Sequence, residues 1–297
     1  MTSTATPART LSTPTGPLVP RLLLGTRLRE LRRRAGLGQP AAARAVGMTE
    51  ATLSRLERGR TGCDPAGLAA LAALYGVRDE AERVTLEALA EQTNIPGWWE
   101  EHLDALPKWT RRYVSAEQTA KLVRTFEPQL VPDLLQTPDY AREILRLRHP
   151  RATPAELERR VAVIMARQRV LRRRPRPVNL WIVLDESVLL RQVGGRLVIR
   201  DQLQHLLDLD TRPNITLQIA TFEAGAATAM TGGSLTLVRF PQQILPDLVY
   251  LERFDGASYP SRPDEVERHW HVFNTLVTEA QQPEATPHII RRLLRGL

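Results

Sequence analysis

The 297-residue sequence has one cysteine, Cys63, only 5% aromatic residues and no long apolar run. A single cysteine excludes an internal disulfide and any zinc-finger framework. The first twenty residues lack the continuous apolar core of a signal peptide. No later run approaches the roughly 20 apolar residues that a transmembrane helix needs. These absences predict a cytoplasmic protein with no membrane partner.

The segment 37–59 has the pattern of two short helices joined by a tight turn. Gly47 stands at the turn, where a residue without Cβ accepts a positive φ at little cost. Thr49 is placed to cap the second helix, in which Leu53 and Leu56 share one face. This arrangement is typical of a helix-turn-helix, whose second helix enters the major groove. The residues turned outward are Glu50, Ala51, Thr52 and Arg55.

The spacing of eight residues resembles that of the Xre/Cro family of repressors: Gln39, Ala43, Gly47, Thr49, Leu53, Leu56, Glu57 and Gly59. The resemblance implies that Gln39 and the outward residues of the second helix contact DNA. It also implies a salt bridge between Arg32 and Glu57. The sequence departs from the family at Gly38, which replaces the usual capping side chain, and at Pro40. The predicted DNA-binding residues are Gln39, Thr49, Glu50, Ala51, Thr52, Arg55, Arg58, Arg33 and Arg34.

The positive charge is concentrated in the same region. The chain has 41 basic and 33 acidic residues, a net charge of +8. The segment 21–60 has ten arginines and three acids, whereas 61–297 has 30 basic and 30 acidic residues. A basic patch on one small domain is typical of phosphate binding, so we expect double-stranded DNA as a partner. Arg33 and Arg34 would position the domain on the backbone rather than read bases.

The pattern along the chain predicts an α+β protein in three parts. We expect a disordered arm at 1–20, an all-α helix-turn-helix domain of five helices at 21–92, and an α+β domain with a central mixed sheet at 98–297. In the last part, helices are predicted at 116–126, 156–171, 201–209 and 264–280, and strands at 180–184, 215–219, 235–238 and 248–251. The glycine pairs at 194–195 and 232–233 have the pattern of hairpin turns.

The second half also resembles a known domain. Six phrases carry the likeness in order and spacing: VPDLLQTPDYARE (131–143), RQRVL (167–171), WIVLDESVLLRQVGG (181–195), QLQHLLDL (202–209), PNITLQI (213–219) and VYLE (249–252). They are similar to the C-terminal domain of antitoxin-like Xre regulators from mycelial, spore-forming bacteria. The resemblance implies a small acidic protein partner, because genes of this type usually lie beside one for such a protein. Relatives often have Leu-Pro where this chain has Ala220-Thr221.

Catalysis is a weaker interpretation of the second half. Carboxylates follow two predicted strands, at Asp185-Glu186 and at Glu252, and could line a cleft. Asp185 also stands where the N-cap of a helix at 187–191 is expected, and capping is the favoured interpretation. His269 and His271 are two residues apart on a helix, so they face different directions and cannot chelate one metal. We therefore predict no enzyme activity, no metal and no cofactor.

These observations favour a sequence-specific DNA-binding transcriptional regulator that acts as a homodimer. The second basic run, at 172–176, is either a solvated turn or a site for the acidic partner. The alternatives are a regulator gated by a small molecule, whose binding residues the sequence does not identify, and an enzyme fused to a DNA-binding domain.

Overall fold

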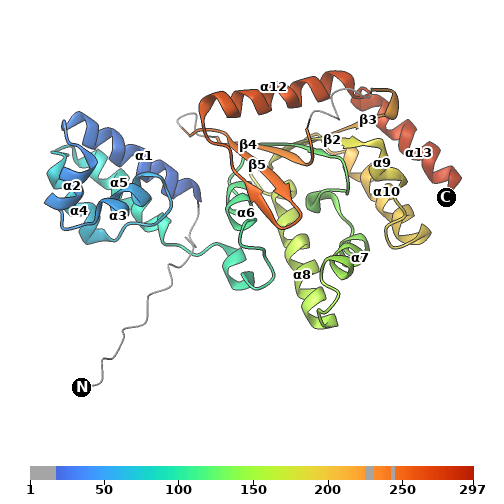
Figure 1. Cartoon of the computed structure of the whole chain (residues 1–297), viewed down its shortest axis with the longest axis horizontal. Helices are drawn as coiled ribbons and strands as arrows, with labels where there is room; N and C mark the ends of the chain where they lie inside the picture. Colours follow the sequence, from blue (N-terminus) through green and yellow to red (C-terminus); the bar gives the residue numbers. More distant parts are fainter. Residues whose placement is uncertain (1–17, 225–230, 242–244) are drawn as a thin grey trace. The chain divides into compact units, whose positions relative to one another are not determined.

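The computed structural model describes residues 18–224, 231–241 and 245–297 of the chain, which divides into two compact units (Figure 1). The first unit extends to Glu100 and the second runs from Glu101 to Leu297. The predicted α+β class, with a helical first part and a mixed sheet in the second, is confirmed.

Within the described residues, the first unit consists of α1 (Leu18–Arg34), α2 (Gln39–Ala45), α3 (Glu50–Glu57), α4 (Pro65–Leu74) and α5 (Glu80–Thr93). Their core is built from leucines at helical spacing, with Leu24, Leu28, Leu53 and Leu71 fully buried. Cys63 belongs to this core, and burial raises the pKa of its thiol to about 12. The thiol is therefore protonated at neutral pH and unreactive.

The predicted boundary of the arm at residue 20 is wrong, because α1 already begins at Leu18. Leu18 and Val19 are buried, and Pro20 lies in the first turn, where no backbone donor is needed. The remainder of the predicted arm, 1–17, lies outside the described residues.

The second unit has a six-stranded sheet in the order β3-β2-β1-β4-β5-β6. The strands are β1 (Leu122–Glu127), β2 (Asn179–Asp185), β3 (Ile215–Ala220), β4 (Leu235–Arg239), β5 (Leu248–Arg253) and β6 (Gly256–Ser258). β1, β2 and β3 pair in parallel, and the contacts from β1 through β4 and β5 to β6 are antiparallel. The expectation of a mixed sheet is thus confirmed.

Helices cover both faces of this sheet (Figure 1). They are α6 (Arg111–Glu117), α7 (Pro138–Arg148), α8 (Pro154–Arg167), α9 (Glu186–Leu190), α10 (Arg196–Asp210), α12 (Pro263–Glu279) and α13 (Thr286–Gly296). α12 packs on one face, where Phe273 and Leu276 meet Phe126 and Leu237 in an apolar core. Among the described residues, no helix has both the length and the apolar character to cross a bilayer.

The predicted helix at 116–126 is wrong. α6 ends at Glu117, and Leu122–Glu127 forms β1 at the centre of the sheet. The polar residues Arg124 and Thr125 among apolar ones gave this segment a helix-like pattern. The segment forms a strand because it pairs with β2 on one side and with β4 on the other, and its β-branched residues Val123 and Thr125 favour that conformation.

The predicted hairpin turns are also wrong. Gly194 and Gly195 connect α9 to α10, and Gly195 stands at the N-cap of α10 with φ 85°. Gly232 and Gly233 precede β4, whose neighbours are β1 and β5 rather than β3. Both pairs adopt positive φ, as residues of tight turns do, but neither pair joins two neighbouring antiparallel strands.

Candidate nucleic-acid interface

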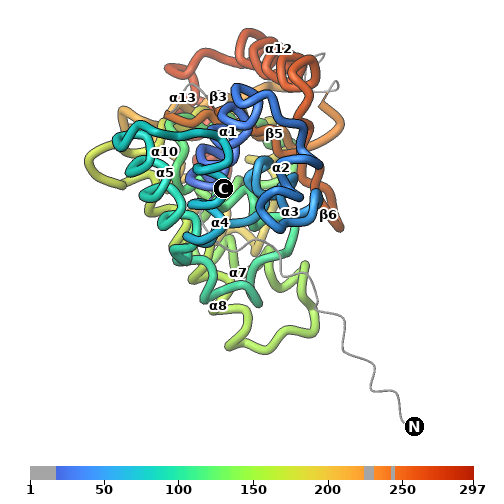
Figure 2. Tube along the Cα trace, turned by 90° about the vertical axis from the view of Figure 1, so that its left-hand side faces the viewer, coloured from blue at the N-terminus to red at the C-terminus, as the bar shows by residue number. Residues whose placement is uncertain are grey.

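The turn between α2 and α3 is formed by Gly47, at φ +68°. Thr49 ends the turn as the N-cap of α3, and its Oγ1 accepts a hydrogen bond from the Thr52 backbone N at 3.1 Å. α2 and α3 pack against each other, and Figure 2 shows them side by side. Pro40 lies in the first turn of α2, where proline is tolerated, and Gly38 supplies no side-chain cap.

α3 is fixed to the core by its inner face and by a close backbone contact with α1. Leu53 and Leu56 are buried beneath α3. A Cβ at Gly25 of α1 would lie 2.4 Å from the Leu56 carbonyl oxygen and 2.8 Å from that of Glu57. Only glycine therefore permits this approach between the two helices.

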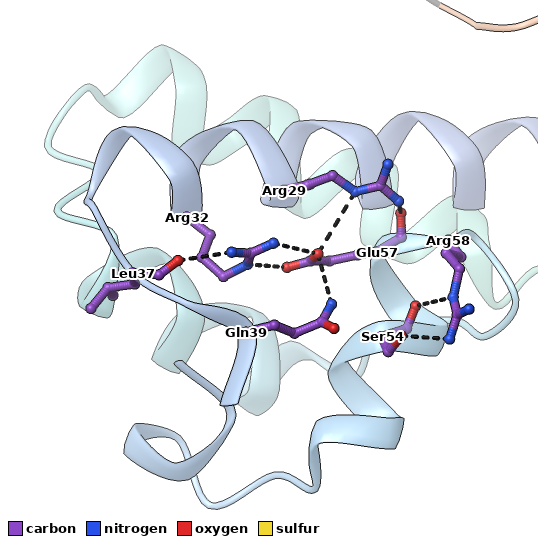
Figure 3. A network of polar contacts seen from close by, with 7 residues as sticks. All are labelled: Arg29, Arg32, Leu37, Gln39, Ser54, Glu57 and Arg58. Carbon is purple, nitrogen blue, oxygen red and sulfur yellow. Dashed lines mark hydrogen bonds and ion pairs between the residues drawn. The ribbon is translucent and has the colours of Figure 1, made fainter. Parts of the chain in front are cut away.

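Glu57, at the end of α3, is the centre of a buried polar network (Figure 3). Arg32 of α1 donates to both carboxylate oxygens, from Nε at 2.6 Å and from Nη2 at 2.9 Å. Its Nη1 also donates to the Leu37 carbonyl oxygen at 2.8 Å. Arg29 donates to the Glu57 backbone oxygen at 2.7 Å. The hydrogen bonds to Glu57 raise the pKa of Arg32, so its guanidinium stays charged throughout the physiological range.

Gln39 lies in the same network. Its Nε2 donates to Glu57 Oε2 at 3.0 Å, so the side chain is held even though Gly38 gives α2 no capping side chain (Figure 3). The network thereby joins α1, the start of α2 and the end of α3. A DNA contact by Gln39 stays a prediction.

The outer face of α3 has the residues that the sequence nominates for base reading. Glu50 and Ala51 are exposed, and Thr52 and Arg55 are half-buried. The Thr49 and Thr52 hydroxyls are 2.8 Å apart, and Arg55 Nη2 donates weakly to Thr52 Oγ1 at 3.4 Å. Because that bond is long, the Arg55 guanidinium can exchange it for a base edge at low cost.

The predicted backbone-contacting arginines differ in how they are held. Arg33 and Arg34, at the end of α1, are exposed and have no side-chain partner among the described residues. Arg58 folds back on α3, donating to the Ser54 backbone oxygen at 3.1 Å and to its hydroxyl at 2.5 Å (Figure 3). Arg58 is thus oriented along the helix that it follows.

Two further exposed arginines were missing from the predicted site. Arg44 lies in the last turn of α2 and Arg60 follows α3 by three residues. The helix-turn-helix spacing does not include them. The local excess of arginine could have identified them, because both are among the ten arginines of the segment 21–60.

The two carboxylates at the end of β2, which were considered for an alternative enzyme site, have structural partners. Asp185 caps α9 by accepting from the Ser187 backbone N at 2.9 Å. Glu186 accepts from the Phe222 backbone N at 3.1 Å. Across the described ranges, no group of three or more His, Cys, Asp or Glu side chains is arranged to hold a metal ion.

Comparison with protein families gives two matches. Residues 110–292 match a family described as a domain of unknown function (DUF5753), and residues 23–86 match a helix-turn-helix domain. The second match begins within α1 and runs through α2, α3 and α4 to the middle of α5, and it includes the Glu57 network. The comparisons with curated proteins and with solved structures gave no match.

Proposed function

The chain belongs to the family defined by the domain of unknown function DUF5753, here preceded by a helix-turn-helix domain, and we propose that it is a sequence-specific transcriptional regulator of Xre type. The observation that carries the proposal is the outer face of α3. Glu50, Ala51, Thr52 and Arg55 lie on one surface, and the Glu57 network fixes the helix that presents them.

The test is selection of duplexes from a random library by the full-length protein, followed by a genome-wide map of occupied sites. We expect one enriched motif that recurs at the occupied sites. Specific proteins bind their sites about 10³-fold or more tightly than random DNA. Enrichment without a motif, or binding that is equal for all sequences, would contradict sequence-specific regulation.

We propose that the regulator acts as a homodimer in the cytoplasm. A single helix-turn-helix contacts one half-site, and two copies on an inverted repeat supply the affinity that one module lacks. The second unit has the size and the core to hold two copies together. No catalytic role is assigned to it in this proposal.

The antitoxin-like part of the proposal is a small acidic protein partner that binds the second unit. Arg172, Arg174 and Arg176 are exposed and have no side-chain partner among the described residues. Arg173 anchors this run to the segment before β1 through the Ala120 carbonyl oxygen at 3.0 Å. Lys121, which follows directly, is exposed as well. The run is therefore held in place while its charges face solvent.

The charge-reversal triple variant Arg172→Glu, Arg174→Glu, Arg176→Glu tests this site. We expect it to lose an acidic partner that copurifies with the wild-type chain at low salt, since such contacts depend on opposite charge. Arg268→Glu, at an exposed position of α12, is the matched control. Equal recovery of the partner with the triple variant and the control would contradict the assignment.

A further inference from the structure

One face of the sheet in the second unit changes from apolar to polar side chains between β2 and β1. On β2 and β3 this face is apolar, with Ile182 and Leu217 in register. On β1, β4 and β5 the continuation of the same row is Thr125, Thr236 and Tyr250, all buried. The Thr125 and Thr236 hydroxyls are 2.9 Å apart. Hydroxyls thus occupy positions where a sheet normally buries aliphatic side chains.

The next row along the same face consists of Glu127, Ser234 and Glu252. The ladders end at the pairs Phe126–Leu235 and Thr236–Tyr250, and the alternation of side chains, carried one and two residues further, places Glu127, Ser234 and Glu252 on this face. Ser234 Oγ donates to Glu127 Oε2 at 2.8 Å, and Thr125 Oγ1 donates to Oε1 at 3.2 Å. Two carboxylates therefore lie on either side of a serine, two strands or about 10 Å apart along the sheet.

This row lies where ligands bind in open α/β sheets. β1 and β5 both end at this edge, since each is antiparallel to β4. β1 is also where the strand order turns, with β2 and β3 on one side and β4, β5 and β6 on the other. Ligands of open sheets bind beyond the carboxyl ends of strands at such a point.

The negative charge at this edge exceeds the positive charge. Arg167 is the buried cation beside it, and it is already bound to Glu117 and to Asp133, at 2.8 Å and 2.5 Å. Arg148, at the end of α7, lies near enough to Glu252 to lower its pKa but forms no ion pair with it. Neither Glu127 nor Glu252 has a cationic partner within salt-bridge distance among the described residues. Burial raises the pKa of Glu127 to about 8, and burial followed by the charge of Asp133 raises the pKa of Glu252.

A buried hydroxyl beside the two carboxylates lacks a hydrogen bond. The Tyr250 side chain is 3% exposed. Glu252 and Thr110 lie close to its OH, but neither makes a hydrogen bond of good geometry with it in the described structure. Tyr250 precedes Glu252 by two residues on the same face of β5, and its hydroxyl lies towards the Glu252 carboxylate. A buried hydroxyl without a partner is unfavourable, and a polar ligand that bonds to it would remove that cost.

We propose that a small organic cation with primary amine or guanidinium groups binds at this edge, between Glu127 and Glu252, and displaces the proton of Glu127 into solvent. The amine N–H groups would donate to both carboxylates and to the Ser234 hydroxyl oxygen. Since the site lies wholly within the second unit, the inference goes beyond the proposed function and does not depend on DNA binding.

The test is calorimetric titration of the full-length protein at pH 7 with 1,4-diaminobutane and with agmatine. Titrations in two buffers of different ionisation enthalpy measure proton release. We expect saturable binding of at least one amine with release of up to one proton. The neutral 1,4-butanediol has the same length as the diamine and should give no heat of binding.

Variants locate the site. Glu252→Gln should weaken amine binding by about tenfold or more, because one charge-assisted contact is lost. Glu127→Gln should weaken it similarly and abolish the proton release. Ser234→Ala leaves both carboxylates in place and should weaken binding by a smaller factor. This variant tests the site even if a Gln variant fails to fold. Glu267→Gln, at an exposed position of α12, is the control.

Several results would overturn the proposal. One is the absence of saturable binding by both amines. Equal affinity in Glu252→Gln and Glu267→Gln would place the amine elsewhere on the surface. Saturation by MgCl₂ with the same proton release and the same variant dependence would show a metal site instead of one for an organic cation.

Discussion

Replacing Arg32 by alanine tests the Glu57 network. Glu57 is 3% exposed and would keep only Gln39 and Arg29, whose Nε is 3.7 Å from Glu57 Oε2. Removing one partner of a buried ion pair costs about 3–5 kcal/mol. Because two partners remain, we expect the lower end, a loss of about 3 kcal/mol in the free energy of unfolding of the first unit. For a unit of this size that corresponds to a fall in Tm of about 12–24 °C.

Arg33→Ala and Arg34→Ala are the matched controls, since both side chains are exposed and lie on the same helix. Each should change the free energy of unfolding by less than about 0.5 kcal/mol. Each should also reduce the slope of log K against log salt for DNA binding by about 1 if it contacts a phosphate. Urea denaturation, followed by hydrogen exchange of the α1 and α3 amides, measures the first effect. If Arg32→Ala unfolds at the same urea concentration as the two controls, the Glu57 network does not stabilise the first unit.

Four further outcomes are expected. Arg55→Ala should weaken the best operator by about 1–3 kcal/mol more than random DNA, whereas Arg58→Ala should weaken both alike; competitive gel-shift titrations compare them. Gly25→Ala should destabilise the first unit by about 1–3 kcal/mol in urea denaturation, because the new methyl group would meet backbone oxygens of α3. The fragment 1–92 should sediment as a monomer and bind the operator weakly, whereas the full chain should sediment as a dimer on DNA; a monomeric full-length complex contradicts this. Burial raises the pKa of Glu127 to about 8, so between about pH 5 and 8 this carboxyl group is protonated in the folded protein and ionised in the unfolded chain. The free energy of unfolding should therefore fall as the pH rises through this range. Glu127→Gln should therefore flatten that fall in urea denaturation, against Glu267→Gln as control.

The first unit could be predicted almost fully from the sequence, because its signals are local. The cap at Thr49, the turn at Gly47 and the buried Leu53 and Leu56 all depend on residues within one or two turns of each other. The hydrogen bond that fixes the Gln39 side chain could not be predicted from local signals. It depends on Glu57, 18 positions away, and on the approach of α1 that Gly25 permits.

The second unit was predicted less completely, since its organisation depends on long-range pairing. The strands at 180–184, 215–219, 235–238 and 248–251 were found because each is rich in aliphatic or β-branched residues. Their order was not predictable, as β1 pairs with β4 across more than 100 residues. α13 was missed as well, although its apolar pairs at 289–290 and 293–294 are spaced as on one face of a helix; only its packing on α10 and β3 depends on distant parts of the chain.

The misassigned strand β1 and the proposed cation site have the same cause. A central strand between two others is normally apolar on both faces, but β1 has Arg124 on one face and Thr125 and Glu127 on the other. That polarity made the segment resemble a helix with a solvated side. Burying these groups costs stability unless each finds a partner. Thr125 has its partner in Thr236, whereas Glu127 has only hydroxyl donors and an elevated pKa. A sequence that breaks the rule for a buried strand at the centre of its sheet, and leaves one carboxyl group there without a cation, has the pattern expected where a side chain serves binding rather than folding.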